Sequence, residues 1–191
     1  MKSKTIIEYA VIIVAAVLLA LAIQGFLVKP YRIPSPSMVS TLLPGDRVLV
    51  DRVGYHFSPP SRGDIVVFNS VKAGLDAPGA LPYLTLIKRI VGLPGETVSL
   101  EDGHVLIDGV RLDEPYIHKG ADGVPDPTNP FIRGTPWSLE EPFTLGPDEY
   151  FMMGDNRTMS EDSRGWGPMY SHEIIGKAFF MYWPITRIGV L

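Results

Sequence analysis

The sequence predicts a mainly β domain of antiparallel strands that follows one N-terminal transmembrane helix. Three observations support this fold class: one long apolar segment lies at the N-terminus, short apolar runs fill the rest of the chain, and Gly, Pro and Asp separate those runs. After the N-terminal segment, apolar residues follow a helical spacing only for about one turn near 37–42. The 191 residues fit one compact domain, with an anchor predicted over 1–29 and the β domain over 30–191.

The N-terminal segment 6–28 is nearly all apolar, with Glu8 as its one charged residue. As an α-helix rising about 1.5 Å per residue, it would span the roughly 30 Å hydrocarbon core of a bilayer. A cleaved secretory signal is the alternative, because Ala-Leu-Ala at 20–22 fits a cleavage site. The apolar run continues to Val28, which is longer than the apolar part of such signals and favours a retained anchor.

The strands are expected where short apolar runs rich in Val and Ile are bounded by turn residues. These runs lie at 47–53, 64–68, 84–91, 97–100, 104–107, 150–153 and 174–183. Asp108-Gly109 between two apolar runs predicts a tight β-hairpin, since both residues tolerate positive φ. The stretch 108–150 contains a segment rich in Pro, Gly and Asp, and we expect it to be a loop-rich excursion from the domain.

Composition excludes several classes of function. The chain has 17 basic and 21 acidic residues, and its net charge of −4 argues against nucleic-acid binding. It has no cysteine, which excludes disulfides, thiolate zinc sites and cysteine nucleophiles. Its four histidines lack metal-ligand spacing, so we predict neither a metal nor a cofactor.

The segment that follows the apolar helix contains a candidate nucleophile. Pro34 and Pro36 stiffen the chain on either side of Ser35, and a residue before proline is held extended. Ser37 is therefore expected at the end of a rigid extended segment, where its hydroxyl could act as a nucleophile. A simple Pro/Ser linker between anchor and domain explains the same residues.

The strand expected over 84–91 contains a candidate base. With a period of two, Lys88 shares a face with Leu84, Leu86 and Ile90. Desolvation among aliphatic side chains would lower the pKa of its amine from the usual value of about 10.4, and such a lysine can act as a general base. The alternative is that Lys88 extends to solvent. The polar segment 154–167 alone indicates a surface loop, braced by a possible charge pair between Asp162 and Arg164.

These three segments together resemble the type I signal peptidases, the membrane-anchored Ser/Lys proteases that remove export signals. The matching motifs are Pro-Ser-x-Ser-Met at 34–38, Lys-Arg-x-Val-Gly-Leu-Pro-Gly at 88–95 and Gly-Asp-Asn-Arg-x-x-Ser-x-Asp-Ser-Arg-x-x-Gly at 154–167. The resemblance covers about 30–185. It implies a signal-peptidase-like antiparallel β domain with a single N-terminal anchor.

The resemblance also implies roles for individual residues. Ser37 would be the nucleophile and Lys88 the general base, while the Ser35 hydroxyl and the Ser37 amide would form the oxyanion hole. Ser160 would hydrogen-bond to the Lys88 amine and orient it.

Further residues would support these groups or bind substrate. A salt bridge between Asp162 and Arg164 would hold the 154–167 loop, with support from Asp155 and Arg157. The residues expected to line apolar pockets for small substrate side chains at −1 and −3 are Tyr31, Ile33, Leu42 and Ile87. Two departures from the family pattern are expected to change pocket shape: Ser40 where proline is usual, and Pro36 where glycine is frequent.

The implied function is that of a serine endopeptidase that removes N-terminal signal peptides after small residues. Its partners would be preprotein signal peptides and the lipid bilayer, with no nucleic acid and no metal. It would lie in the plasma (inner) membrane as a single-pass protein, with its catalytic domain on the extracytoplasmic side. The alternatives are a self-cleaving Ser/Lys protease and a non-enzymatic membrane-tethered β adaptor. A Ser37 Oγ to Lys88 Nζ distance within hydrogen-bond reach favours catalysis, whereas a gap above roughly 8 Å favours the adaptor.

Overall fold

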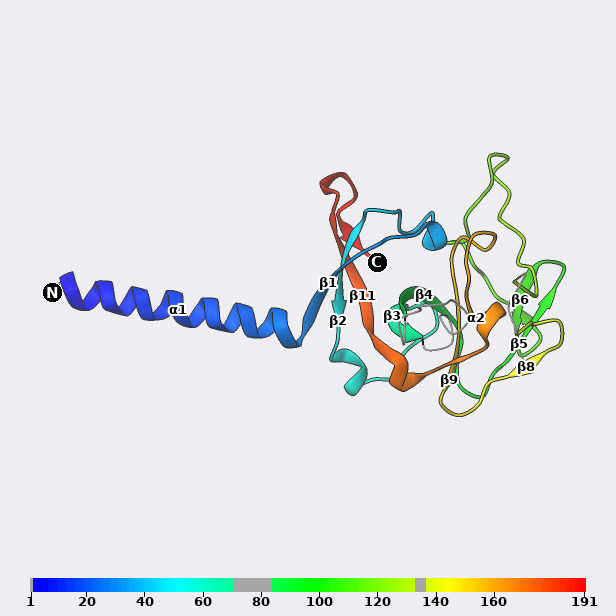
Figure 1. Ribbon diagram of the computed structural model, residues 1–191, viewed down its shortest axis with the longest axis horizontal. Coiled ribbons are helices and arrows are strands. Elements are labelled where there is room, and N and C mark those ends of the chain that lie inside the picture. The colour runs from blue at the N-terminus through cyan, green and yellow to red at the C-terminus, as the bar shows by residue number, and fades with distance from the viewer. Residues whose placement is uncertain (1, 71–83, 133–136) are drawn as a thin grey trace, which may run out of the picture.

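A long N-terminal helix projects from a β domain in the computed structural model, which describes residues 2–70, 84–132 and 137–191 (Figure 1). Helix α1 comprises Lys2–Phe26, and its described side chains at 5–20 are exposed. Among the residues that the structure describes, no helix is both long enough and apolar enough to cross a membrane. The helix is thus present, and its predicted membrane span stays a prediction.

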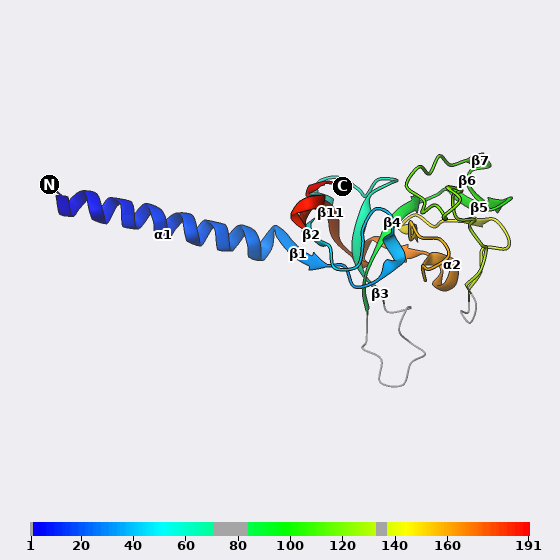
Figure 2. The same ribbon diagram turned by 90° about the horizontal axis from the view of Figure 1, so that it is seen from above.

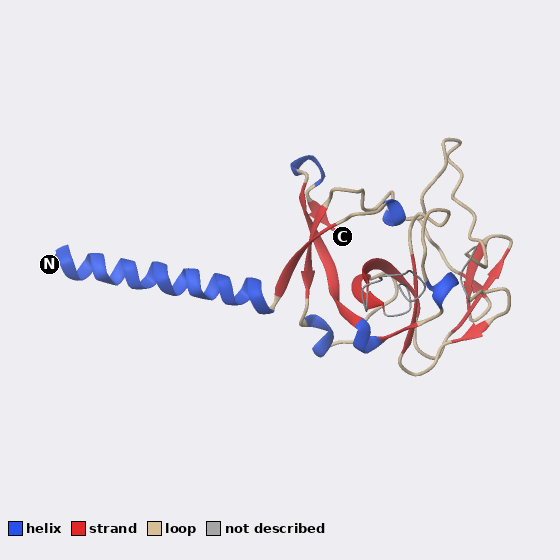
Figure 3. Ribbon diagram, viewed as in Figure 1, coloured by secondary structure: helices blue, strands red, loops and turns tan. Residues whose placement is uncertain are grey.

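The larger sheet has eight strands and begins directly after this helix, and its neighbouring strands pair antiparallel. Its order is β1-β2-β11-β3-β4-β9-β10, and β12 pairs with β11. The strands are β1 Val28–Arg32, β2 Arg47–Asp51, β3 Ile65–Ser70, β4 Leu84–Gly92, β9 Glu149–Met153, β10 Met169–Tyr170, β11 Ile174–Trp183 and β12 Gly189–Val190. The strands and loops that dominate the domain confirm the predicted mainly β, antiparallel class (Figure 3).

A smaller sheet of four strands lies at the end of the domain remote from α1 (Figure 2). Its order is β7-β6-β5-β8, formed by β5 Thr97–Glu101, β6 His104–Ile107, β7 Val110–Arg111 and β8 Phe143–Thr144. Asp108 and Gly109 join β6 to β7 with φ of 51° and 78°, which confirms the predicted hairpin. Between β7 and β8 the described chain has only isolated bridges, and 133–136 of the predicted excursion lie outside the described residues.

Every predicted strand range contains a strand, but the end of the N-terminal helix was predicted wrongly and one strand was missed. The apolar helix was expected to continue to Val28, whereas α1 ends at Phe26 and Val28 begins β1. This strand escaped prediction because Pro30 interrupts it. It lies at the edge of the sheet, where a missing N–H is tolerated, and it pairs with β2.

The core consists of three apolar clusters, and β4 contributes to each. Ile87 belongs to the cluster under β1 and β2, Ile90 to the cluster near β10, and Val91 to the cluster beneath the smaller sheet. The middle of β4 is therefore covered, and Lys88, which lies between Ile87 and Ile90, is removed from water.

Candidate active site

The candidate nucleophile lies in a single helical turn. Ser35 has extended backbone angles, φ −127° and ψ 160°, and Pro36–Met38 form the 3₁₀ helix η1. Proline suits the first position of such a turn because its φ is preset and its missing N–H has no partner there. The extended segment thus ends at Ser35, and the prediction that Ser37 ends it was wrong. Ser37 is buried within the turn, which contacts β4.

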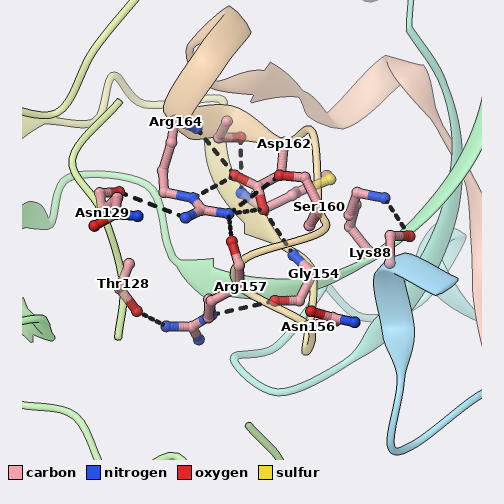
Figure 4. A network of polar contacts seen from close by, with 12 residues as sticks. Lys88, Thr128, Asn129, Gly154, Asn156, Arg157, Ser160, Asp162 and Arg164 are labelled. Carbon is pink, nitrogen blue, oxygen red and sulfur yellow. Dashed lines mark hydrogen bonds and ion pairs between the residues drawn. The ribbon is translucent and has the colours of Figure 1, made fainter. Parts of the chain in front are cut away.

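The side chains of Ser37 and Lys88 meet. Lys88 Nζ and Ser37 Oγ lie 2.8 Å apart, although 51 residues separate them in sequence (Figure 4). Lys88 is 3% exposed and Ser37 is 4% exposed, so Lys88 does not extend to solvent. The hydroxyl of Ser35 lies 3.2 Å from the hydroxyl of Ser37. The distance that the catalytic prediction requires is therefore present, and the wide gap that would favour an adaptor is not.

Burial changes the protonation of the amine. Desolvation lowers the pKa of Lys88 from 10.5 to about 8, against the opposing effect of Asp162 and Glu161. At pH 7 a pKa of about 8 leaves roughly a tenth of the amine neutral, compared with about 0.03% at 10.5. A neutral amine can accept a proton, so the position has the property of a general base.

A pocket of about 230 Å³ opens beside the two side chains. Its walls come from the end of β1, the segment before η1, β3 and β4, and include Tyr31, Ile33, Val67 and Ile87. Three of the four predicted pocket residues are therefore in place. Leu42 is not in the wall, because it is fully buried in the apolar cluster behind Ile33 and Ile87.

Most of the polar segment 154–167 is buried rather than a surface loop, with Thr158, Met159 and Glu161 as its exposed residues. Asp162 precedes the short helix α2, Ser163–Trp166, and accepts a hydrogen bond from Arg164 N at its start. Arg164 donates from Nε and Nη2 to the two carboxylate oxygens, at 2.8 and 2.9 Å. Burial would raise the pKa of Asp162, but the Arg164 charge and hydrogen bonds outweigh it and hold that pKa below its usual range. This predicted salt bridge is present (Figure 4).

Gly154 lets this loop approach the nucleophile turn closely. Its N–H donates to Asp162 Oδ2 at 3.0 Å. A Cβ on Gly154 would lie 2.4 Å from Ser37 O and 2.2 Å from Ser160 Oγ, so no side chain fits. Among the described residues, Ser160 is buried beside these groups without a hydrogen bond to Lys88 Nζ. The contact predicted to orient the amine is thus not found among the described residues, and the Ser160 hydroxyl lies next to Gly154.

Asp155 connects the same loop to the strand that carries Lys88. Arg89 Nε and Nη2 donate to its two carboxylate oxygens, at 2.9 and 2.7 Å. Thr41 Oγ1, from the chain just beyond η1, donates to Asp155 Oδ2 at 2.5 Å. The Arg89 guanidinium also lies over the Tyr116 ring, 4.0 Å from its centre. Arg89 follows Lys88 on β4, so this ion pair holds the strand next to the candidate base.

Arg157, near the start of the 154–167 segment, connects it to the chain between β7 and β8. It pairs with Glu114, donates to Thr128 Oγ1 at 2.6 Å and donates to Gly154 O at 3.1 Å. The sequence motifs contained Arg89 and Asn156, but we had assigned neither a role. Within the described part of the chain, no cluster of three or more His, Asp or Glu is placed to hold a metal ion.

These groups have the chemistry of acyl transfer. A serine hydroxyl becomes a strong nucleophile when an adjacent base takes its proton, and nearby N–H and O–H donors can stabilise a developing oxyanion. A buried amine, a hydroxyl within its reach and an open apolar pocket therefore define the class of serine hydrolases with an amine base.

Comparisons with known proteins place the chain more narrowly. The family model described as signal peptidase, peptidase S26, matches residues 6–183. A signal peptidase I of Leptolyngbya laminosa is 40% identical over 176 residues, covering 92% of this chain and 79% of the relative. Signal peptidase IB of Staphylococcus aureus is 31% identical over 190 residues, covering 96% of this chain and 93% of the relative. A crystal structure of a signal peptidase I from Enterococcus faecalis aligns with a TM-score of 0.48 and 30% identity, over 63% of this chain and 97% of that chain.

The chain belongs to the signal peptidase family, peptidase S26. The resemblance predicted from the motifs at 34–38, 88–95 and 154–167 is thereby confirmed. The chain is an enzyme, a peptidase of the signal peptidase I type, and a non-enzymatic adaptor does not fit this membership.

Proposed function

We propose that this chain is a serine endopeptidase that removes N-terminal signal peptides from exported preproteins, with Ser37 as nucleophile and Lys88 as general base. The observation that carries the proposal is the 2.8 Å contact between Lys88 Nζ and Ser37 Oγ, both shielded from water. The low pKa of the amine, about 8, supports the assignment because a charged lysine could not accept the proton.

In the first half of the reaction, the neutral Lys88 amine takes the Ser37 proton while Oγ attacks the scissile carbonyl. The resulting oxyanion would lie against the Ser35 hydroxyl, which is 3.2 Å from Ser37 Oγ, and the Ser37 N–H. The ammonium then gives its proton to the leaving amine, and an acyl-enzyme remains. Water attacks this ester with Lys88 again as base, and the carboxylate product leaves.

The pocket supports a preference for small side chains next to the cleaved bond. Its roughly 230 Å³ must be shared by two substrate residues if both −1 and −3 point into it. Tyr31, Ile33 and Ile87 offer apolar walls without charge, which suits alanine. An extended substrate alternates its side chains, so −1 and −3 face the same way when the chain lies along a strand edge.

We also propose that residues 1–29 anchor the chain in the plasma (inner) membrane, with 30–191 as the catalytic domain on the extracytoplasmic side. Strand β1 begins two residues after α1 ends, and Arg52 N donates to Leu27 O at 2.9 Å. This bond connects the residue that follows α1 to the residue that follows β2. The signal peptide of a preprotein under export lies in the same bilayer. A tethered catalytic domain would therefore meet it at the membrane surface.

The test is cleavage of a preprotein by the full chain in detergent or vesicles. Ser37→Ala and Lys88→Ala should each abolish processing and leave the circular dichroism spectrum unchanged. Lys177→Ala is the matched control, because Lys177 is 42% exposed and pairs with Asp64 away from the pocket. Processing by Lys88→Ala at the wild-type rate would overturn the proposal.

A further inference from the structure

One residue, Asn156, holds the two carbonyl groups that flank the Ser37 backbone. Asn156 Nδ2 donates to Pro36 O at 3.3 Å, and Asn156 N donates to Ser37 O at 3.1 Å. Asn156 is 4% exposed and comes from the 154–167 loop, 120 residues from Pro36 in sequence. Both contacts therefore join two distant parts of the site.

The orientation of the Asn156 amide follows from its neighbours. Its Oδ1 accepts hydrogen bonds from Met159 N and Thr158 Oγ1, both at 3.2 Å. A backbone N–H can only donate, so the oxygen of the amide must face Met159. The Nδ2 group is then directed to Pro36 O, which can only accept.

Holding the Pro36 carbonyl determines where the Ser37 N–H points. The two groups are opposite edges of one planar trans peptide unit, so fixing the direction of one fixes the other. Ser37 is the second residue of η1, and the first N–H groups of a helical turn have no partner within it. A hydrogen bond accepted by a peptide carbonyl also polarises the N–H of the same peptide and strengthens it as a donor.

We infer that Asn156 is a positioning residue that aims and strengthens the Ser37 N–H as an oxyanion donor. The inference rests on the proposed function, in which this N–H faces the tetrahedral intermediate. Consecutive residues then hold both halves of the site. Asp155 fixes β4 through Arg89, next to Lys88, and Asn156 fixes the turn that carries Ser37.

The decisive variants are Asn156→Ala and Asn156→Asp. Alanine removes the side-chain donor to Pro36 O and leaves the Val39 N–H, which donates to the same oxygen at 3.1 Å. We therefore expect kcat to fall about tenfold, a fraction of the roughly 10²–10³ that loss of a whole oxyanion donor costs. Asp keeps the shape and the acceptor for Met159 N, but it presents an oxygen to Pro36 O, so we expect a loss of about a hundredfold. Thr158→Val is the matched control, since it removes the Oγ1 contacts to Asn156 Oδ1 and Asp126 Oδ2, keeps the contact of Asn156 to Pro36 O, and should leave kcat within twofold.

Four further readouts separate positioning from loss of structure. In Asn156→Ala, KM and the pH midpoint of the rate should stay unchanged, because neither the pocket nor Lys88 is altered. In Asn156→Asp the new carboxylate should raise the pH midpoint, as the nearby Asp155 does, so its kcat is compared on the alkaline plateau. Affinity for a substrate-like peptide aldehyde, which forms a tetrahedral adduct with serine, should fall in parallel with kcat/KM. Affinity for the matching reduced-amide peptide, which has no carbonyl at the cleavage position, should not fall.

A kcat within twofold of wild type in Asn156→Asp would overturn the inference. A fall in reduced-amide affinity as large as the fall in aldehyde affinity would overturn it as well, since the residue would then act on the fold or the pocket. If the circular dichroism spectrum shows that Asn156→Ala is unfolded, the isosteric Asn156→Asp variant alone tests the inference. Failure of the proposed function is detected independently, because active Ser37→Ala or Lys88→Ala would show it whatever Asn156 does.

Discussion

Two buried cationic groups lie in neighbouring parts of this site, and their surroundings differ. Arg164 is 1% exposed and meets both carboxylate oxygens of Asp162, as well as the carbonyl of Arg157 at 2.8 Å. Lys88 is similarly removed from water, but its amine contacts the hydroxyl of Ser37. Among the described residues, no carboxylate forms an ion pair with Lys88.

The difference separates a structural charge from a chemical one. A buried guanidinium with a bidentate carboxylate partner braces the chain around it. A buried cation without such a partner gives up its proton more readily, as the lowered pKa of Lys88 indicates. The 154–167 loop thus supplies a fixed frame, and β4 supplies a group whose charge can change.

The largest expected effect comes from breaking the ion pair between Arg164 and Asp162. Asp162→Asn leaves Arg164 buried without its counter-charge, and we expect the free energy of unfolding to fall by about 3–5 kcal/mol. Because the Asp162 charge raises the pKa of Lys88, its loss should also lower the pH midpoint of activity. Denaturant unfolding and a pH–rate profile measure both effects. A variant as stable as wild type would contradict the structural role of the pair.

The Lys88 amine, which has no carboxylate partner among the described residues, predicts that kcat/KM changes about a hundredfold with pH. The neutral amine is the active form, so kcat/KM should rise with pH and level off above a midpoint near the Lys88 pKa of about 8. At pH 6 roughly one amine in a hundred is neutral, which sets the size of the limb. The measurement is preprotein cleavage from pH 6 to 9, and a flat profile over that range would remove the case for an amine base.

The smallest expected effect is a gain in stability, opposite to the loss expected for Asp162→Asn. The folded-state pKa of Lys88 lies below its unfolded value, so the amine costs stability at pH below about 8 and ceases to do so above about 10.5. Lys88→Met should therefore increase the free energy of unfolding at pH 7, by about 1–3 kcal/mol, while abolishing cleavage. Urea unfolding at pH 7 tests this. If Lys88→Met instead lost as much stability as Asp162→Asn, Lys88 would be a structural charge like Arg164, and the contrast between them would be wrong.

Local sequence predicted most of the strands because alternation of side chains and turn chemistry act over a few residues. Strands β6 and β11 have the predicted bounds, and the β6–β7 hairpin follows from the positive φ that Asp108 and Gly109 tolerate. Strand β1 was missed because Pro30 contradicts a strand pattern unless the strand is known to be an edge. Edge position is a property of the whole sheet.

The same limit applies to the site. Motif spacing named Ser37 and Lys88, but whether they meet depends on η1 packing against β4, across 51 residues of chain. Leu42 was assigned to the pocket wall and lies in the core instead, and Ser160 was assigned a bond to Lys88 that the structure does not contain. Burial depth and side-chain direction at these positions depend on several elements at once.

By itself, the sequence determined the fold class, the family and the identity of the candidate nucleophile and base, because these depend on local patterns and on motifs in a given order. Only the tertiary structure decided that Lys88 is buried and forms an ion pair with no carboxylate in the described part of the chain, and that Asp155 and Asn156 hold its strand and the turn of Ser37. The physical reason is that solvation and hydrogen-bond geometry arise between segments that are distant in the chain.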